Sequence, residues 1–275
     1  MSNLSGEIQD TGKTLAILVA SCDRYSDLWP IFFRLFRRFW PDCPFPVYLL
    51  SNNLEAQFPG VVNVRVGDDI SWSDNLLAAL PGVNADYIFL FIDDLLICER
   101  VNTAAVCDVL KDFVRQNGNY IRLNPAPRPD RPLDHLIGSV SAGTLYRTAT
   151  VLSVWKKEIL FDLLKKGETP WEFEIDGSIR SDAYSGFFST HTRILSILNA
   201  VIKGKWERGA IRRLRSLAVG LELGVRPVMT RTEKLRLEFH RIRNWTLNRL
   251  PPESRRRVKN LFSGARRNPV SSARA

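Results

Sequence analysis

Two adjacent carboxylates, Asp93 and Asp94, directly follow the apolar run from Tyr87 to Ile92. An unbroken run of six apolar residues is typical of a strand buried on both faces, as in the centre of a parallel sheet. The pair then lies at the carboxyl end of that strand, where open α/β sheets bind their ligands. Because two Asp side chains and a pyrophosphate can share one hard cation, the pair predicts a site for Mg²⁺ or Mn²⁺. The alternative is a strand end with two solvated turn acids.

A second group of acids, Glu172 and Glu174, alternates with Trp171 and Phe173. In an extended segment both carboxylates would point into one cleft, whereas in a helix they would diverge by about 200°. An aromatic neighbour lowers the local polarity and could raise a carboxyl pKa toward the value wanted in a general base. The alternative is that Trp171 packs on the core and the glutamates cap a helix that begins after Pro170.

Glycine-rich phosphate loops are absent from the sequence, which contains neither G-x-x-x-x-G-K-[ST] nor G-x-G-x-x-G. The charge of a diphosphate would therefore be neutralised by a metal ion and by Lys or Arg. Lys205 follows a predicted strand and is a candidate for such a contact. The alternative is a solvated surface lysine.

Strands and helices alternate along the part of the chain that must position these groups. Predicted strands cover residues 15–20, 46–51, 61–66, 87–92, 120–123 and 143–150, with a return through 194–202. Predicted helices begin near the N-caps Ser26 and Ser73, cover residues 103–116, and extend from Trp155 to Gly167. Alternation at this spacing predicts an α/β fold with a mostly parallel sheet flanked by helices.

Length and composition set the class of protein. With 275 residues and 45% hydrophobic content, the chain can bury a full core, which predicts one large domain or a domain with an appendage. Apolar runs fall short of the roughly 20 residues that a membrane-spanning helix needs. The polar start of the chain lacks the apolar stretch of a secretory signal, so we expect a cytoplasmic protein. Its four cysteines show no C-x-x-C spacing, which predicts neither a zinc site nor a disulfide framework.

Positive charge is concentrated toward the C-terminus. Residues 203–275 hold 20 Lys or Arg against 5 Asp or Glu, whereas residues 1–202 hold 19 against 24. This asymmetry predicts an anionic partner for the basic segment, either a membrane surface or a nucleic acid. We therefore divide the chain into a disordered N-terminus (1–13), a catalytic domain (14–208) and a basic helical extension (209–275).

The basic extension carries a stripe of apolar residues at near-helical spacing: Leu235, Phe239, Ile242, Trp245 and Leu250. A basic amphipathic helix lies in a membrane interface, with its apolar face in the acyl boundary and its Lys and Arg near anionic headgroups. The sequence thus predicts peripheral attachment to the inner face of the cytoplasmic membrane. The alternative is that the stripe packs on the catalytic domain.

Several short motifs occur along the chain: Ser21-Cys22-Asp23-Arg24-Tyr25, Trp72-Ser73, Asp93-Asp94, Trp155-Lys156 and Trp171-Glu172-Phe173-Glu174. Together they resemble bacterial GT-A-type glycosyltransferases of surface-polysaccharide clusters, such as those for capsule or O-antigen. The resemblance covers roughly residues 14–208. It implies a GT-A-like fold and transfer of a sugar from a nucleotide diphosphate sugar to a surface glycan, which includes a lipid-linked glycan.

The same resemblance implies roles for the acids. Asp93 and Asp94 match the family's metal-binding D-x-D position, with an adjacent pair in place of the separated spacing. Glu172, with Glu174 as the alternate, matches the place of the carboxylate that deprotonates the acceptor hydroxyl. An inverting transfer needs such a base, whereas a retaining transfer does not.

Residues around the nucleotide follow from the resemblance as well. Ser21, Asp23 and Arg24 would border the nucleotide, and Trp72 and Ser73 would lie near its base or ribose. Asp23 and Ser73 could instead serve a turn and a helix cap.

Two other functions compete with glycosyl transfer. A nucleotidyltransferase also uses paired Asp side chains and a metal on a nucleoside triphosphate. A non-enzymatic nucleic-acid-binding protein would interleave aromatic with basic residues. Residues 207–275 offer only Phe239, Trp245 and Phe262 for that purpose, so the sequence favours an enzyme and argues against a nucleic-acid partner.

Overall fold

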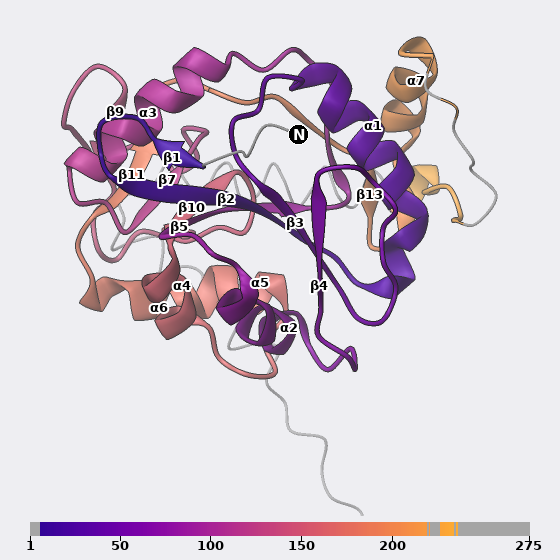
Figure 1. Cartoon of the computed structure of the whole chain (residues 1–275), viewed down its shortest axis with the longest axis horizontal. Helices are drawn as coiled ribbons and strands as arrows, with labels where there is room; N and C mark the ends of the chain where they lie inside the picture. Colours follow the sequence, from indigo (N-terminus) through magenta and orange to yellow (C-terminus); the bar gives the residue numbers. More distant parts are fainter. Residues whose placement is uncertain (1–5, 219, 221–225, 234, 236–275) are drawn as a thin grey trace, which may run out of the picture.

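The computed structural model describes residues 6–218, 220, 226–233 and 235, and its centre is a ten-stranded sheet (Figure 1). In order across the sheet the strands are β4 (Val61–Arg65), β3 (Val47–Ser51), β2 (Lys13–Ala20), β5 (Tyr87–Ile92), β10 (Ser153–Lys156), β7 (Tyr120–Arg122), β11 (Phe187–Thr190), β9 (Ile137–Ser139) and β8 (Arg131–Pro132), and β1 (Glu7–Ile8) pairs with β2. Strands β4, β3, β2, β5, β7 and β11 run in one direction, whereas β10 runs in the opposite direction between β5 and β7.

Helices cover both faces of this sheet, which confirms the predicted α/β class (Figure 1). The α-helices are α1 (Trp29–Phe39), α2 (Trp72–Ala79), α3 (Thr103–Arg115), α4 (Lys157–Leu163), α5 (Pro170–Glu172), α6 (Ser178–Arg180) and α7 (Arg208–Ser216). Helices α1 and α3 lie over one face, and α2, α4, α5 and α6 lie over the other. Helix α7 lies beside α1, where Arg38 Nη1 donates to the carbonyl of Leu217 at 2.6 Å.

Short elements complete the chain. The 3₁₀ and π turns are η1 (Asp23–Leu28), η2 (Leu80–Gly82), η3 (Phe173–Gly177, a π-helix) and η4 (Ser181–Ala183). The small strand pairs are β6 (Leu95–Ile97) with β12 (Ile197–Asn199), and β13 (Val201–Ile202) with β14 (Lys205–Trp206). Among the residues that the structure describes, no helix is both long enough and apolar enough to cross a membrane.

The central strand β2 shows why the sheet forms here. Residues from Leu15 to Ala20 are all apolar and buried, and successive side chains enter the cores on opposite faces of the sheet. A strand covered on both faces by helices reads as a continuous apolar run, which is what the sequence shows. Ala20 pairs with Ile92 of β5 in parallel register, so Ser21 and Asp93 emerge side by side at one edge.

Two predicted elements differ from the structure. Residues 143–150, predicted as a strand, form turns, because their backbone and hydroxyl groups bind side chains of the α5–α6 segment instead of a neighbouring strand. The N–H of Thr148 donates to Ser178 Oγ at 3.0 Å, and that of Thr150 donates to Glu174 Oε1 at 2.8 Å. Trp155, predicted in a helix, lies in β10, where it is fully buried in the sheet's core.

The predicted helix caps are displaced. Ser26 lies inside η1, and α1 begins after Leu28 without a side-chain cap. Ser71 caps α2 by accepting from the N–H of Asp74, while Ser73 lies within the helix. Only α2 of these two helices therefore has a side-chain cap, which comes from a residue two positions before the predicted one.

The predicted domain limits also differ from the described fold. Within the segment predicted to be disordered, Glu7–Ile8 form β1 and the side chain of Ile8 is buried in the main core. The predicted boundary at residue 208 coincides with the start of α7, whose residues Ala210 and Leu214 are fully buried in the same core. The apolar stripe beyond Leu235 lies outside the described residues.

Candidate active site

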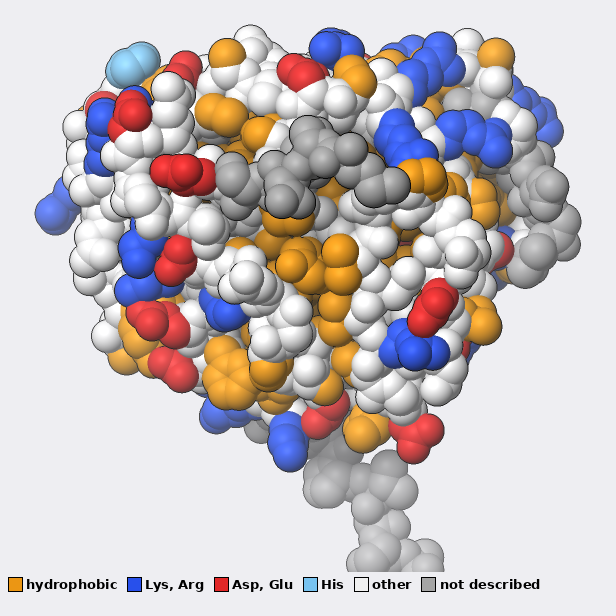
Figure 2. Space-filling model, viewed as in Figure 1, with side chains coloured by type: hydrophobic (Ala, Val, Ile, Leu, Met, Phe, Trp, Pro, Cys, Tyr) orange, Lys and Arg blue, Asp and Glu red, His pale blue; other side chains and the backbone are white. Residues whose placement is uncertain are grey.

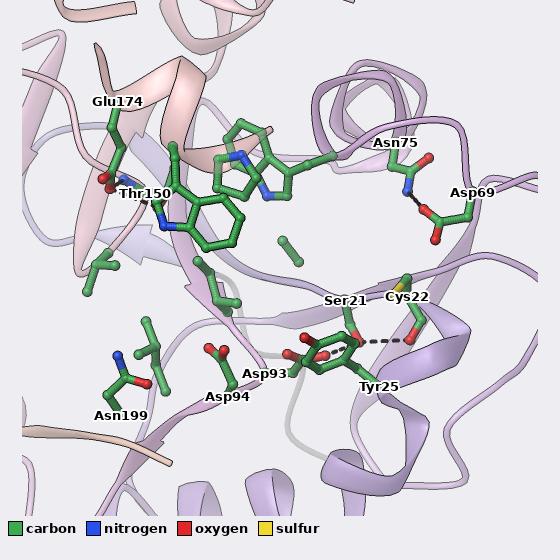
Figure 3. Close-up of a pocket in the computed structure, with 17 residues that line it drawn as sticks. Ser21, Cys22, Tyr25, Asp69, Asn75, Asp93, Asp94, Thr150, Glu174 and Asn199 are labelled. Atoms are coloured by element: carbon green, nitrogen blue, oxygen red, sulfur yellow. Dashed lines mark hydrogen bonds between the residues drawn. The ribbon is translucent and has the colours of Figure 1, made fainter. Parts of the chain in front are cut away.

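A cavity of about 310 Å³ lies at the carboxyl ends of β2 and β5. Cavities that bind small ligands have volumes of about 300–1,000 Å³. Its lining comes from the turns that follow β2 and β5, from α2, from α5 and η3, and from β12. Figure 3 shows the polar side chains of these elements arranged around one common space. The sheet thus gathers residues that are far apart in the sequence, and we refer to this cavity as the pocket.

Asp93 lies at the base of the pocket and is only 2% exposed. Its carboxylate accepts a hydrogen bond from the Ser21 hydroxyl, which in turn accepts from Trp29 Nε1 at 2.7 Å. Burial raises the pKa of Asp93 well above its ordinary value, the Ser21 hydrogen bond lowers it in part, and the charge of Asp94 raises it further. Ser21 therefore positions the first of the two predicted metal-binding acids.

Asp94 faces the pocket next to Asn199 of β12 (Figure 3). The carbonyl of Asp94 accepts from the N–H of Ala200 at 2.9 Å, which ties the acidic turn to β12. Burial raises the pKa of Asp94 to about 6, against the lowering effects of its own backbone N–H and of Arg226. Two desolvated carboxylates side by side carry an electrostatic cost that a cation would remove.

Among the residues that the structure describes, the pocket lining contains four acids and neither Lys nor Arg: Asp69, Asp93, Asp94 and Glu174. A diphosphate would be repelled by this lining unless a cation accompanied it. The described residues contain no cluster of three or more His, Cys, Asp or Glu that could enclose a metal ion. A magnesium ion typically needs only one or two carboxylates, because phosphates and waters complete its octahedron. Asp93 and Asp94 fit that role.

A polar pair lies on another side of the pocket. Asn75 Nδ2 donates to Asp69 Oδ1 at 2.9 Å (Figure 3). The side chain of Arg24 reaches Asp69 Oδ2 at 3.4 Å. Trp72 also lines the pocket, and its indole Nε1 is buried without a hydrogen-bond partner among the described residues. A carboxylate and an amide beside an indole ring can bind the hydroxyls of a ribose and the face of a base.

Glu174 points into the pocket from η3 (Figure 3). Its Oε1 accepts from both the backbone N–H and the hydroxyl of Thr150, at 2.8 and 2.9 Å. Oε2 accepts no hydrogen bond from a described side chain or backbone group. One oxygen thus fixes the carboxylate, and the other remains available to a ligand.

Glu172 takes a different direction. Thr169 and Glu172 form a capping box: Thr169 Oγ1 accepts from the N–H of Glu172, and Glu172 Oε2 accepts from the N–H and hydroxyl of Thr169. Because the segment after Pro170 is helical, residues two positions apart diverge. Glu172 is outside the pocket lining and has the helix-capping role given above as the alternative. Of the two aromatics, Phe173 is fully buried, whereas Trp171 is 62% exposed at the rim.

The structure does not bring every predicted residue into the lining. Asp23 accepts backbone N–H groups of Asn52, Asn53 and Leu54, and so closes a turn. Ser73 is buried on the far side of α2, where its hydroxyl accepts from the N–H of Glu168. Asp23 thus has the turn role that the sequence left open, whereas Ser73 binds the Glu168 backbone and does not have the predicted capping role.

Two predicted cationic contacts also lie outside the lining. The Arg24 side chain is 81% exposed and borders the pocket only through Asp69. Lys205 forms an ion pair with Glu233 at 2.6 Å, away from the acidic turn. Lys205 is therefore not part of the pocket lining that the structure describes, contrary to the contact that the sequence suggested for a diphosphate.

Several lining residues escaped the sequence interpretation, namely Asp69, Asn75, Thr150 and Asn199. Each lies in a turn, a helix or a short strand without a local motif, and only the fold places them together. Tyr25 differs, because it belongs to the motif that follows the first strand of the catalytic body.

Three solved structures illustrate how remotely this chain resembles known proteins. No family model matches the chain, and no curated protein matches it. Among solved structures, S. aureus TarS 1–349 shares 10% identity at a TM-score of 0.44, with 66% of this chain and 59% of that chain covered. Mannosyl-3-phosphoglycerate synthase from Rubrobacter xylanophilus shares 14% identity at a TM-score of 0.37, with 57% and 58% covered.

A third solved structure is the galactosyltransferase LgtC in complex with donor and acceptor sugar analogues. It shares 11% identity at a TM-score of 0.38, with 62% of this chain and 71% of that chain covered. The matched part of TarS 1–349 and of the synthase is below two thirds of their own length. At these identities and TM-scores the likeness assigns no activity, so we infer function from the residues of the pocket.

Proposed function

We propose that the chain is a glycosyltransferase that takes its sugar from a nucleotide diphosphate sugar. The observation that carries this proposal is the arrangement of three polar groups around one pocket at the carboxyl ends of parallel strands. The Asp69–Asn75 pair beside Trp72 suits a nucleoside, the Asp93–Asp94 turn suits a diphosphate with a divalent cation, and Glu174 suits an acceptor hydroxyl. The sequence resemblance to GT-A-type enzymes supports the same assignment.

Asp93 and Asp94 would hold Mg²⁺ or Mn²⁺ against the diphosphate. The ion supplies stabilisation of the negative charge that develops on the departing diphosphate. The Ser21 hydroxyl donates to the Asp93 carboxylate and so holds this carboxylate in place at the base of the pocket. The acids that the described residues contribute to the lining support a metal-assisted reaction, since their combined charge is negative.

Glu174 would act as the general base of an inverting transfer. Thr150 holds Oε1, so Oε2 can accept the proton of the acceptor hydroxyl. The acceptor oxygen then forms a bond to the anomeric carbon. The bond from that carbon to the diphosphate oxygen breaks, and its electron pair leaves with the nucleoside diphosphate. This assignment replaces Glu172 as the first candidate, because Glu172 is occupied in the capping box.

The acceptor that we propose is a surface glycan, including one carried on a lipid. Its support is the distribution of charge: exposed arginines lie on α1 and α7, namely Arg34, Arg37, Arg38, Arg212, Arg213 and Arg215. Figure 2 shows Lys and Arg side chains gathered over this region. A basic face suits an anionic membrane surface, where a lipid-linked acceptor would be confined.

A thermal-shift screen tests the donor class. We expect a nucleotide diphosphate sugar to raise the unfolding temperature when Mn²⁺ is present and not when it is chelated. A ligand at 100 times its dissociation constant stabilises by about 2.7 kcal/mol. Asp93→Asn and Asp94→Asn should each abolish the shift, with non-additive effects if the two share one ion. A double variant that bound the donor as tightly as wild type would remove the metal assignment.

A further inference from the structure

A short segment after α7 is bonded to the body of the protein and to the turn that follows β2. We call residues 226–233 the strap. The N–H of Trp206 donates to the carbonyl of Pro227 and the N–H of Met229 donates to that of Trp206, both at 2.9 Å. Arg208 Nε donates to the carbonyl of Met229 at 3.0 Å. These bonds attach the strap firmly, so its first residue has a defined position.

That first residue, Arg226, is almost fully enclosed by η1. Its guanidinium donates to both carboxylate oxygens of Asp27, at 2.7 and 2.6 Å, and to the carbonyl of Arg24 at 2.8 Å. The guanidinium carbon also lies 4.1 Å from the centre of the Tyr25 ring. Only 9% of the Arg226 side chain is exposed. A forked, stacked contact of this kind fixes the geometry of both partners.

The element that Arg226 fixes is part of the pocket wall. Turn η1 begins two residues after Ser21, whose hydroxyl binds Asp93, and Tyr25 lines the pocket itself. In Figure 3, Tyr25 lies next to Asp93 and Ser21. Burial raises the pKa of Tyr25, and the charge of Asp94 raises it further while that of Arg226 lowers it. Arg226 therefore contacts a ring of the pocket wall that itself lies beside Asp93.

We infer that the strap is part of the donor site and that Arg226 is a positioning residue, which holds η1 and the Tyr25 ring against the acidic turn. The inference rests on the proposed function, because it assigns Arg226 to the binding of the nucleotide diphosphate. The inference also extends the catalytic domain, predicted to end at residue 208, so that it includes the strap. Arg226 acts through Tyr25 and η1, without lining the pocket itself.

The test measures affinity for uridine, guanosine and cytidine diphosphates with Mn²⁺ by calorimetry on the full chain. We expect Arg226→Met to weaken the best of these at least tenfold, which corresponds to about 1.4 kcal/mol. Asp27→Asn should weaken it similarly, and the double variant should add little, because both changes break one contact. Arg100→Met is the matched control: it removes an arginine whose ion pair with Asp42 lies outside both the strap and the pocket lining, so affinity should stay near wild type.

The conservative variant separates geometry from charge. Arg226→Lys keeps the positive charge but cannot form the two parallel bonds to Asp27, so it should recover only part of the affinity. Full recovery with Lys would overturn the positioning role. Hydrogen exchange supplies a readout that is independent of the ligand: Arg226→Met should speed exchange in residues 23–28 and leave that of α3 unchanged.

Two negative results are distinguishable. If the wild-type chain bound one of the diphosphates and Arg226→Met bound it equally well, the inference would fail while the proposed function stood. If no diphosphate bound the wild-type chain with Mn²⁺, the proposed function would fail, and the donor-site role of the strap with it.

Discussion

Two glutamates that are two positions apart in one short motif have unrelated environments. Glu174 is fixed by Thr150 and faces the pocket, whereas Glu172 closes the capping box at the start of the same helical segment. The difference follows from backbone geometry alone, since a helical turn sends the two side chains in divergent directions. At the scale of the residue, we therefore propose the chemical role for Glu174, and Glu172 has the helix-capping role.

This assignment predicts unequal effects of two matched substitutions. Glu174→Gln removes the proton acceptor but keeps the side-chain shape, so kcat should fall by roughly 10²–10⁴-fold, the usual worth of a positioned general base. Donor affinity should change little. Glu172→Gln should cause a much smaller loss, because the amide oxygen can still accept from the N–H of Thr169. Steady-state rates at saturating donor make the comparison, and equal rates in wild type and Glu174→Gln would exclude general-base catalysis by this residue.

The raised pKa of Asp94 predicts how stability depends on pH. Its folded-state pKa is about 6, above the ordinary 3.8, so the folded state holds the proton more tightly than the unfolded state. The free energy of unfolding therefore loses a contribution as pH rises from about 4 to 6. Asp94→Asn removes this loss and should raise the free energy of unfolding at pH 8 by about 1–3 kcal/mol, with little effect at pH 4.

Urea unfolding at the two pH values measures this prediction. Asp86→Asn is a suitable control, because the pKa of Asp86 is shifted in the opposite direction from that of Asp94. Burial raises the pKa of Asp86, but hydrogen bonds from Thr14 and Lys13 outweigh burial and lower it overall. Asp86→Asn should therefore destabilise the chain at pH 8. An Asp94→Asn variant that was also less stable at pH 8 would show that the carboxylate is not held at an electrostatic cost.

At the scale of the element, the helical segment from Pro170 to Arg180 supplies both Trp171 at the rim of the pocket and Glu174, the proposed general base. Its start depends on the hydroxyl of Thr169, which accepts from the N–H of Glu172. Thr169→Ala should lower the free energy of unfolding by about 0.5–2 kcal/mol, as for other helix caps. Thr169→Ser keeps the hydroxyl and should stay close to wild type. Thermal unfolding of both variants checks this, and equal destabilisation by Ala and Ser would rule out the capping bond as the cause.

The elements that the sequence predicts well are those whose apolar pattern is decided locally. Strands β2 and β5 read as continuous apolar runs because helices cover both faces, and their carboxyl ends could therefore be located with the acidic pair. The prediction of a strand at residues 143–150 was wrong because polar groups of this segment bind Ser178 and Glu174, which come from a distant part of the chain. Asp69 and Asn199 carry no local signal, since only the sheet order places them at the pocket. Long-range contacts are what a single sequence does not display.

At the scale of the whole molecule, charge is divided between an acidic pocket and a basic face. The described part of α7 exposes Arg212, Arg213 and Arg215 beside the arginines of α1. Each basic residue close to an anionic membrane contributes about 1 kcal/mol to binding. We therefore predict flotation with anionic vesicles, weakened by high salt, and no flotation with neutral vesicles.

The strap determines how truncations for that experiment should be designed. A truncation after Glu207 would remove α7 and Arg226 as well as the basic tail, so it would damage the fold together with any membrane site. A truncation after Leu235 keeps both. If this shorter chain floats less than the full chain, the tail contributes to binding; charge reversal of Arg212 and Arg215 tests the folded basic face. If the wild type did not float with anionic vesicles, membrane attachment would be contradicted. If wild type and both variants floated equally with anionic and neutral vesicles, attachment through the basic residues would be contradicted.

The central claim is that the pocket transfers a sugar from a nucleotide diphosphate. The most direct measurement is the identification of the nucleotide product after incubation of the full chain with Mn²⁺, a panel of nucleotide diphosphate sugars and glycan acceptors. The account predicts free nucleoside diphosphate, formed together with a lengthened glycan and lost in Asp94→Asn and Glu174→Gln. Release of pyrophosphate from nucleoside triphosphates, with no turnover of any nucleotide sugar, would contradict it and identify a nucleotidyltransferase.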